Sequence, residues 1–528
     1  MKRRLFLFVF FFLTLSCSSD EHGNTVDDFD EDASVDTDTD IDSDTDTDTD
    51  TDTDSDSDSD TDSDTAIQYW QDRVDEFFGE APDKETRLEV FEALWSEFAK
   101  AYACFDTYNI DWDEKRDHYR PLVEAATSYG RFVQLLNEMI GDLKDSHSIL
   151  DSFKVCFENP SFDKPPRFRP YHLFPRIGGC VTLDNEDNLL VYLLGEVNPL
   201  GLGLGDIIVG LNNKTWQENL DEISSWKIPF CEDYGSNDPA LRHNISQGLP
   251  NNPHLFDTIE VLKADTGEVE SYSLEEVTVT NASYEMCTDQ LPVAGVGSPA
   301  DDWPTYDGVG CSNCLAYGII DGTDVGYITV YAWHGEALVD FQNAVEELYD
   351  TTQGLIVDQR YNQGGVKPFI EYGFPVLFNE SIDPVLSFQY RDDIEDYLSL
   401  QEHNVMAIDA DPETYYDHPI AVLTGPKAGS AGDMCPYALR LHPRARVFGK
   451  PSNGAFGETT PMWNRDPFLD DLIANGTVAQ AVSADGIHLQ GSIQEPDVDV
   501  WLTKDDVMAG VDTVLEAALE WIKTENSK

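Results

Sequence analysis

The second half of this sequence predicts an α/β fold built around a largely parallel sheet. Residues 315–528 alternate short apolar runs of strand type with amphipathic stretches of helix type. Two of the runs are Val325–Val330 and Gly354–Asp358, and Ala337–Tyr349 between them has helical periodicity. Strands that alternate with helices in this way favour an α/β core.

Further elements extend this core over residues 281–528. Ile420–Thr424 and Ala445–Gly449 have the composition of buried strands, and 434–441 is expected to be the helix between them. Residues 66–167 are expected to form an N-terminal helical domain, because apolar residues recur at helical spacing. Residues 168–280 change to short β-type runs and predict a separate β domain.

The N-terminus has the pattern of an export signal. Residues 2–4 are basic and precede an apolar stretch over 5–15 that is too short to span a bilayer comfortably. The letters L-T-L-S-C ending at Cys17 are similar to a bacterial lipobox, so residues 1–17 are interpreted as a lipoprotein signal peptide with Cys17 lipidated. A plain secretory signal cut nearby is the alternative. Both predict an exported protein, periplasmic or at the cell surface, and the first anchors it to a membrane.

Residues 18–65 are interpreted as a disordered acidic linker, because like charges repel and few apolar side chains are present to pack. From Asp36 to Asp64 it consists almost entirely of Thr-Asp and Ser-Asp pairs. The chain carries a net charge of −68, and residues 20–64 contribute 22 of its acidic groups, so the remainder still carries −46. Nucleic acid is therefore not expected as a partner, since phosphate binding needs clustered Lys and Arg.

Eight cysteines remain if Cys17 is lipidated, and an even number in an exported protein favours disulfides. Cys311 and Cys314 form a lone C-x-x-C, without the second pair or the histidines that a zinc site needs, so a structural disulfide is the preferred interpretation. The pairing stays open, and neither a metal nor an organic cofactor is expected.

Three segments carry residues suited to nucleophilic chemistry. Ser430 stands between an apolar strand and a helix, where a side chain is exposed and backbone N–H groups are free, although a serine there is often a helix cap. Gly364 and Gly365 follow a buried strand and could bring N–H groups close to a ligand, or simply form a tight turn. His147 is a candidate base for a serine, which is a poor nucleophile without one.

Together these segments resemble the tail-specific and tricorn-like serine peptidases. The letters D-Q-R-Y-N-Q-G-G at 358–365 are similar to that family's D-x-R-x-N-x-G-G, and the segment around Ser430 to its S-A-S-E region. The ending at 493–498 is similar to its G-V-x-P-D close, and 198–212 to the G-L-x-x-G-D-x-I-x-x-I-N stretch of PDZ domains. The resemblance implies a crotonase-like (ClpP/crotonase-type) α/β catalytic core, with a PDZ-like domain that presents peptide ends.

In the resemblance, Ser430 is the nucleophile and His147 the base, with Ser146 between His147 and Gln490. Gly364, Gly365 and Ala431 surround the oxyanion, with N–H donors from Gly364 and Ala431. The sequence departs from the family at two places. Ala455 stands where some members have a Lys base, and Lys450 is out of register. Gln490 stands where the tricorn-like branch has a Glu, so an acid such as Asp485 or Glu458 is an alternative source of negative charge.

The implied function is that of an exported serine peptidase that hydrolyses peptide bonds in peptide or protein substrates, tail-specific or processing. The alternative is a catalytically impaired homologue that binds peptides or ligands as a surface lipoprotein.

Overall fold

The computed structural model describes residues 60–157, 165–170, 176–231, 235–275, 287–296, 305–306, 311–312, 314–366, 368–391, 400–410, 415–463 and 471–528. The expected signal peptide, Cys17 and the linker as far as residue 59 lie outside the described residues. Helix α1 begins at Asp60, within the stretch assigned to the linker. Within the described residues, every helix is either too short or too polar to cross a membrane.

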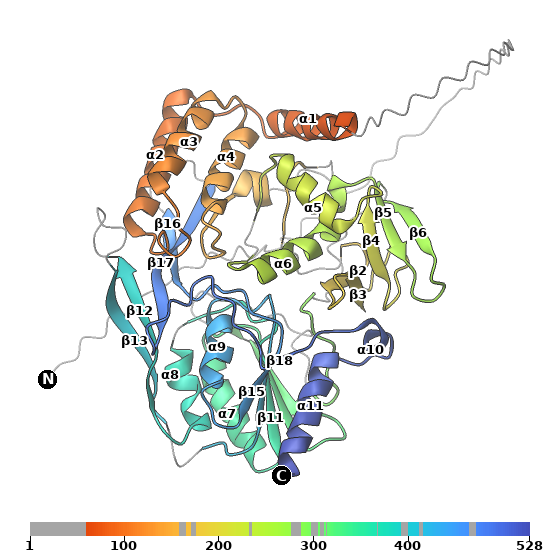
Figure 1. The fold of residues 1–528 in the computed structure, drawn as a ribbon, viewed down its shortest axis with the longest axis vertical. Helices are drawn as coiled ribbons and strands as arrows, with labels where there is room; N and C mark the ends of the chain where they lie inside the picture. Colours follow the sequence, from red (N-terminus) through yellow and green to blue (C-terminus); the bar gives the residue numbers. More distant parts are fainter. Residues whose placement is uncertain are drawn as a thin grey trace, which may run out of the picture.

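The N-terminal part is helical (Figure 1). Each of its later helices begins at a capping side chain. Asp83, Asp111 and Ser128 each accept a backbone N–H from the first turn, which satisfies one of the donors that a helix leaves unpaired there. The helices are α1 (Asp60–Phe77), α2 (Lys84–Ala101), α3 (Trp112–Ala125) and α4 (Tyr129–Gly141). The apolar faces of α2, α3 and α4 pack together and against Leu472 and Ala474 of a strand far along the chain, whereas Trp70 and Val74 of α1 pack in the apolar core that follows.

A five-stranded antiparallel sheet with order β2-β3-β4-β5-β6 forms the β domain. Asp206 shapes its glycine-rich turn, because its carboxylate accepts the N–H groups of Gly203 at 2.7 Å and Ala264 at 2.8 Å. The sheet packs with α5 (Trp216–Ser225) and α6 (Asp238–Asn251) in one apolar core. Its strands are β2 (Gly179–Leu183), β3 (Leu189–Leu194), β4 (Ile207–Leu211), β5 (Thr258–Leu262) and β6 (Val269–Ser273).

The C-terminal half contains the predicted α/β core, and the fold class is confirmed. Its six-stranded sheet has the order β18-β15-β14-β11-β10-β9, parallel except for the antiparallel strand β9. Both faces are covered, because Leu355 and Val357 of β11 face one apolar cluster while Ile356 faces another. The strands are β9 (Leu315–Ile319), β10 (Val325–Val330), β11 (Gly354–Asp358), β14 (Ile420–Thr424), β15 (Ala445–Gly449) and β18 (Val498–Asp499).

Helices cover the two faces of this sheet (Figure 1). Side chains of α7 (Ala337–Tyr349) and α9 (Ala431–Leu439) join the cluster on the Leu355 face, and those of α11 (Thr513–Asn526) join the opposite one. Helix α9 begins three residues before the predicted start of a helix at 434. The shorter elements are α8 (Phe369–Gly373), α10 (Lys504–Met508), β7 (Thr305–Tyr306), β8 (Cys311–Ser312), the 3-10 turns Pro253–Leu255 and Pro375–Leu377, and the π-helix Phe153–Phe157.

A third, antiparallel sheet was not predicted from the sequence. Its main path is β1-β17-β12-β13, and β16 pairs with β17. Strand β1 comes from the N-terminal region and pairs with β17, so the helical part and the core are joined through backbone hydrogen bonds. The strands are β1 (Ile149–Ser152), β12 (Ile382–Arg391), β13 (Leu400–Ile408), β16 (Glu458–Trp463) and β17 (Leu472–Ser483).

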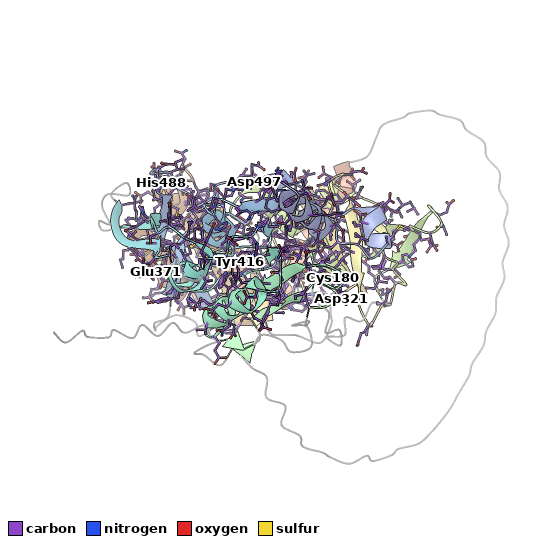
Figure 2. All side chains as sticks on the ribbon, turned by 90° about the horizontal axis from the view of Figure 1, so that it is seen from below. Cys180, Asp321, Glu371, Tyr416, His488 and Asp497 are labelled. Carbon is purple, nitrogen blue, oxygen red and sulfur yellow. A yellow bond between two sulfur atoms is a disulfide. The ribbon has the colours of Figure 1, made fainter. Side chains whose placement is uncertain are left out.

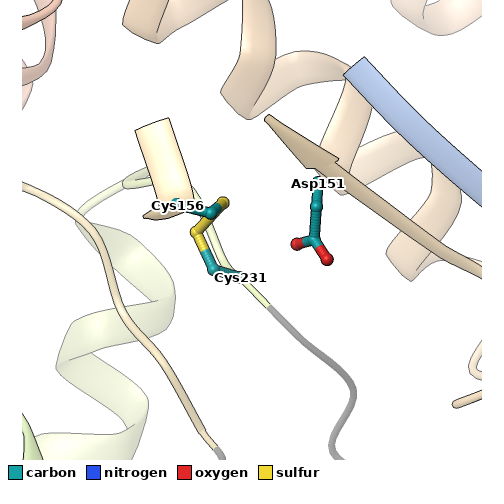
Figure 3. A group of neighbouring side chains, drawn as sticks. All are labelled: Asp151, Cys156 and Cys231. Carbon is teal, nitrogen blue, oxygen red and sulfur yellow. A yellow bond between two sulfur atoms is a disulfide. The ribbon is translucent and has the colours of Figure 1, made fainter. Parts of the chain in front are cut away.

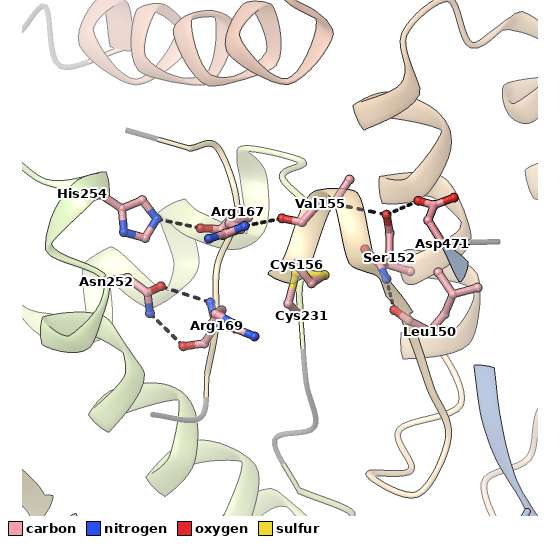
Figure 4. Close-up of a disulfide and its surroundings, with 11 residues drawn as sticks. Leu150, Ser152, Val155, Cys156, Arg167, Arg169, Cys231, Asn252, His254 and Asp471 are labelled. Atoms are coloured by element: carbon pink, nitrogen blue, oxygen red, sulfur yellow. Dashed lines mark hydrogen bonds between the residues drawn. A yellow bond between two sulfur atoms is a disulfide. The ribbon is translucent and has the colours of Figure 1, made fainter. Parts of the chain in front are cut away.

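Two disulfides reinforce the contacts of the β domain. Cys180 of β2 is bonded to Cys287, and Cys156 beyond β1 is bonded to Cys231. Around the second bond, Arg167 donates to the carbonyl of Val155 at 2.6 Å, which connects the chain leaving β1 to the β domain (Figure 4). Figure 2 shows Cys180 and Asp321 toward one end of the molecule and His488 and Glu371 toward the other.

The cysteines do not all form disulfides, although their even number favoured this. Cys314 is disulfide-bonded as expected, but Cys104 and Cys435 are free. Both thiols are buried in separate apolar clusters, where a free cysteine packs as a small hydrophobic side chain.

Candidate active site

Ser430 occupies a strained turn between β14 and α9. Its φ of 58° and ψ of −119° lie in a region that residues with side chains rarely adopt. The side chain makes no capping hydrogen bond to α9, so the simple helix-cap interpretation is wrong. A strained strand-to-helix turn of this kind projects a serine hydroxyl away from the backbone, where it can react.

Gly364, the first residue of the glycine pair, lies directly beside Ser430. A Cβ added to Gly364 would meet the Ser430 Cβ at 2.6 Å and its Oγ at 3.0 Å, so only glycine fits. The N–H of Gly364, however, donates to Asn362 Oδ1 at 2.9 Å. The expectation that this N–H binds an oxyanion is therefore corrected for this conformation, because the Asn362 side chain already occupies the donor.

Two other backbone N–H groups remain candidates for the oxyanion. Ala431 is the first residue of α9, where a helix leaves its N–H without an intrahelical acceptor and with favourable polarity for negative charge. Gly365 has a φ of 141° and packs so closely on Trp333 that an added Cβ would lie 2.3 Å from its carbonyl oxygen. The oxyanion roles of Ala431 and Gly365 therefore stay a prediction.

His147 lies on the turn between α4 and β1. Its Nδ1 is buried and has no hydrogen-bond partner among the described residues, which leaves this nitrogen available for a proton. Burial lowers the pKa of His147, and the charge of Asp145 and the backbone of Gly457 act in the opposite direction. The described side chains of Ser430 and His147 form no hydrogen bond here, and such bonds are often long before a substrate binds.

The segment 451–457 connects the turns that carry Ser430 and His147. Asn453 donates its backbone N–H to the carbonyl of Ala428 at 2.8 Å, two residues before Ser430. Its side-chain oxygen accepts the hydroxyl of Ser146 at 2.7 Å, next to His147. One residue therefore fixes the nucleophile turn relative to the base turn.

Ser146 and Gln490 do not form the expected relay. Ser146 Oγ contacts Asn453 and Ser236 Oγ, the latter at 2.9 Å. Gln490 instead accepts the N–H of Gly457 at 2.6 Å and donates to Asp145 Oδ1 at 2.9 Å. Because both ends of its amide have these partners, Gln490 contacts the base turn through Asp145.

The two alternative acids have different surroundings. Glu458 accepts a hydrogen bond from the Tyr390 hydroxyl, and Asp485 is exposed in the turn after β17. Lys450, the out-of-register candidate base, forms an ion pair with Asp499 at 2.6 Å.

One group of described residues has metal-ligand chemistry, namely Asp151, Cys156 and Cys231, whose ligand atoms lie within 4.8 Å of one another (Figure 3). The two sulfurs are bonded to each other, so neither is a thiolate that could bind an ion. We interpret this group as structural.

Comparison with protein families identifies the core. The model of peptidase family S41 matches residues 324–500, which include Ser430 and the glycine pair. This chain carries a peptidase family S41 core. The model of the tricorn protease C1 domain matches residues 83–141, within the helical part. The S41 peptidases are serine peptidases, which gives the enzyme class and makes peptides or proteins the substrate class.

Solved structures resemble the chain in fold. Mature CPAF in complex with lactacystin is 14% identical with a TM-score of 0.57, and the match covers 84% of this chain and 98% of that protein. A second structure of mature CPAF is 14% identical with a TM-score of 0.58, and the match covers 83% of this chain and 96% of that protein. The photosystem II D1 C-terminal processing protease is 14% identical with a TM-score of 0.40, and the match covers 79% of this chain and 93% of that protein. No curated protein matches the chain.

The candidate site also contains residues that the sequence did not reveal. Asp433, one turn after Ser430, accepts the N–H groups of Gly454 at 2.7 Å and Ala455 at 2.9 Å. Ser236 reaches the site from the β domain and donates its N–H to the carbonyl of Asn453 at 3.0 Å. The N-G pair at 453–454 was the available signal for a turn, but nothing local indicated what it contacts.

Asp433 gives the S41 core a pH-dependent stability. Burial raises its pKa to about 7, against the hydrogen bonds it accepts. The folded state therefore holds this proton more tightly than the unfolded state, so stability from this group is full below the unfolded pKa and is lost as pH rises toward about 7. Between pH 5 and 7 the loss is expected to be about 1.4 kcal/mol per pH unit.

The measurement is the melting temperature of the wild type and of Asp433→Asn at several pH values from 5 to 8. The variant should be less stable at low pH, because its amide NH₂ group would face one of the two backbone N–H groups that now donate to the carboxylate. Its melting temperature should fall less as pH rises. If the melting temperatures of the two proteins changed equally with pH, the result would contradict this assignment.

Proposed function

We propose that this chain is an exported serine peptidase in which Ser430 attacks the peptide bond and His147 is the general base. The observation that carries the proposal is the strained backbone of Ser430, with a hydroxyl that caps no helix and lies against Gly364. Strain of this kind persists only where the surrounding structure enforces it, and it is concentrated at functional sites.

The reaction would follow the acyl-transfer sequence of serine hydrolases. The proton of Ser430 passes to the His147 ring as the oxygen attacks the substrate carbonyl carbon. The N–H groups of Ala431 and Gly365 stabilise the negative oxygen that forms. The leaving amine takes the proton from His147, and a water molecule then hydrolyses the acyl-enzyme with His147 as base again. Each oxyanion donor is typically worth about 100-fold to 1,000-fold in rate.

Export and a lipid anchor at Cys17 are supported by the basic and apolar N-terminus and by the lipobox-like letters that follow it. The disulfides Cys156–Cys231 and Cys180–Cys287 agree with an oxidising compartment. Tail-specific cleavage is supported by the PDZ-like stretch at 198–212, since PDZ domains bind peptide ends by strand addition.

A peptide-binding protein without catalysis is the second candidate. It is favoured by the neutral Gln490 at the family's Glu position and by the lack of a hydrogen bond between the described Ser430 and His147 side chains. This candidate predicts a site that holds peptides but contains no activated serine.

Incubation of the full chain with a fluorophosphonate probe separates the two candidates. A peptidase is expected to be labelled at Ser430, identified by mass spectrometry, and Ser430→Ala is expected to abolish the labelling while His147→Ala lowers its rate by about 100-fold to 10,000-fold. A folded wild-type chain that is not labelled would instead support the binding protein.

A further inference from the structure

In the proposed mechanism, Gln490 cannot neutralise the positive charge that forms on the ring of His147. A histidine that takes a proton from serine becomes an imidazolium, which serine hydrolases stabilise with a nearby carboxylate. Gln490 occupies the position where the resemblance places that carboxylate, and an amide has no charge to offer. A different acid must therefore lie near His147 if the proposed mechanism, on which this inference rests, operates at a useful rate.

Asp145 is the carboxylate that the structure holds against the base turn. Its Oδ1 accepts the backbone N–H of His147 at 3.0 Å and the Nε2 of Gln490 at 2.9 Å. Its Oδ2 accepts the hydroxyl of Ser148 at 3.0 Å. The residue is only 5% exposed, so water screens its charge weakly.

The hydrogen-bond partners of Asp145 do not neutralise its negative charge, so this charge can act on His147. The described groups that donate hydrogen bonds to its carboxylate are neutral. The other titratable groups around it are Tyr102, Cys104 and Tyr108, and burial with the charge of Asp145 raises the pKa of each. These neighbours therefore stay uncharged at neutral pH. The same negative charge acts on the ring of His147 and opposes the effect of burial there.

Gln490 holds the carboxylate of Asp145 through a hydrogen bond. Its side chain is 2% exposed, and its oxygen is fixed by the N–H of Gly457, so its NH₂ group points at Asp145. A glutamate at 490 would bring a second carboxylate within hydrogen-bond distance of Asp145, and two such groups repel each other. The neutral side chain at 490 is thus the one that fits an acid at 145.

We propose that Asp145 supplies the negative charge that stabilises protonated His147, and that Gln490 is a positioning residue that holds Asp145 in place. In the first step the proton moves from Ser430 Oγ to the His147 ring, breaking the O–H bond and forming the N–H bond, and the leaving amine then takes it from His147. Asp145 keeps its charge throughout the reaction and takes no proton.

A purely structural role for Asp145 is the competing explanation, since an aspartate that accepts the N–H of the second residue after it forms an ordinary Asx turn. The two explanations differ in how the rate depends on pH. If Asp145 acts through its charge, its removal lowers the pKa of His147, so the acid limb of the pH profile moves to lower pH. Loss of a turn contact alone reduces the amount of folded protein and leaves the position of that limb unchanged.

The experiment measures the second-order rate of fluorophosphonate labelling of the full chain against pH, for the wild type, Asp145→Asn, Gln490→Glu and the double variant Asp145→Asn/Gln490→Glu. Asp145→Asn is expected to reduce the plateau rate by about 100-fold to 10,000-fold and to shift the acid limb to lower pH. The double variant moves the charge to position 490 and is expected to recover about ten-fold or more.

Asp142→Asn is the matched control. Asp142 lies three residues earlier, is 35% exposed and pairs with Lys115, so its replacement removes the same charge from the same turn without touching Asp145. Its labelling rate should stay within about two-fold of the wild type. Near-ultraviolet circular dichroism confirms that each variant is folded.

The possible results separate this inference from the proposed function. A wild type that is labelled at Ser430, with a folded Asp145→Asn variant whose acid limb does not move, would overturn the role of Asp145 alone. A double variant no faster than Asp145→Asn, again without a shift, would overturn it too. A wild type without labelling at Ser430 would overturn the proposed function itself.

Discussion

Replacing Arg360 by Met is expected to lower the free energy of unfolding by about 3–5 kcal/mol, the cost of breaking a buried ion pair. The guanidinium is completely buried and contacts Asp358 Oδ2 at 2.6 Å and Asp512 Oδ2 at 2.9 Å. It also donates to the carbonyl of Asp289 at 3.2 Å. Methionine keeps most of the apolar volume but leaves two buried carboxylates without a counter-charge.

The measurement is chemical denaturation of the full chain, with the unfolding of the core followed by tryptophan fluorescence. Exposed Arg446 in β15 provides the control, since Arg446→Met should change stability by no more than about 0.5 kcal/mol. Adding Asp358→Asn to Arg360→Met should recover part of the loss, because it removes one uncompensated charge. A loss below about 1 kcal/mol for Arg360→Met would contradict the assignment, since an exposed ion pair contributes that much.

Replacing Gly364 by Ala is expected to abolish labelling of Ser430, with a fall in rate of about 100-fold or more. The added methyl carbon would lie 2.6 Å from Ser430 Cβ and 3.0 Å from its Oγ, so the nucleophile must move. The backbone φ of 114° adds strain for any residue with a side chain.

Gly322 separates these two causes. Its φ of 79° is also unfavourable for alanine, but an added Cβ would have no atom within 4 Å. Gly322→Ala should therefore lower the melting temperature slightly and leave the labelling rate unchanged, whereas Gly364→Ala should reduce both. If Gly364→Ala is labelled at the wild-type rate, the close approach to Ser430 has no bearing on reactivity.

The parts of the site that sequence reasoning found are those encoded by short segments. The serine turn, the glycine pair and the Ser-His dipeptide each follow or precede an element whose apolar pattern is clear. Gly364 shows the limit of this reasoning, because its close approach to Ser430 follows from its lack of a side chain. The direction of its N–H depends on how Asn362 is oriented, which the sequence does not indicate.

Residues that act across long distances in the chain were missed. The roles of Asp145, Ser236 and Asn453 depend on the docking of three segments, and no local pattern specifies which polar groups will meet. The antiparallel sheet of β1, β12, β13, β16 and β17 was missed for the same reason, since its strands are separated by up to hundreds of residues. The sequence predicted that Gln490 departs from the family pattern, and its contact with Asp145 became visible only in the folded chain.

The link through Asn453 also determines when activity can arise during synthesis. Ser146 and Asn453 are 307 residues apart, so the base turn leaves the ribosome long before the segment that aligns it with Ser430. Contacts between such distant segments form late, because the chain must first close a very long loop. The nascent protein therefore contains no assembled site, and its hydrolytic capacity appears only when the C-terminal half has folded around the N-terminal helices.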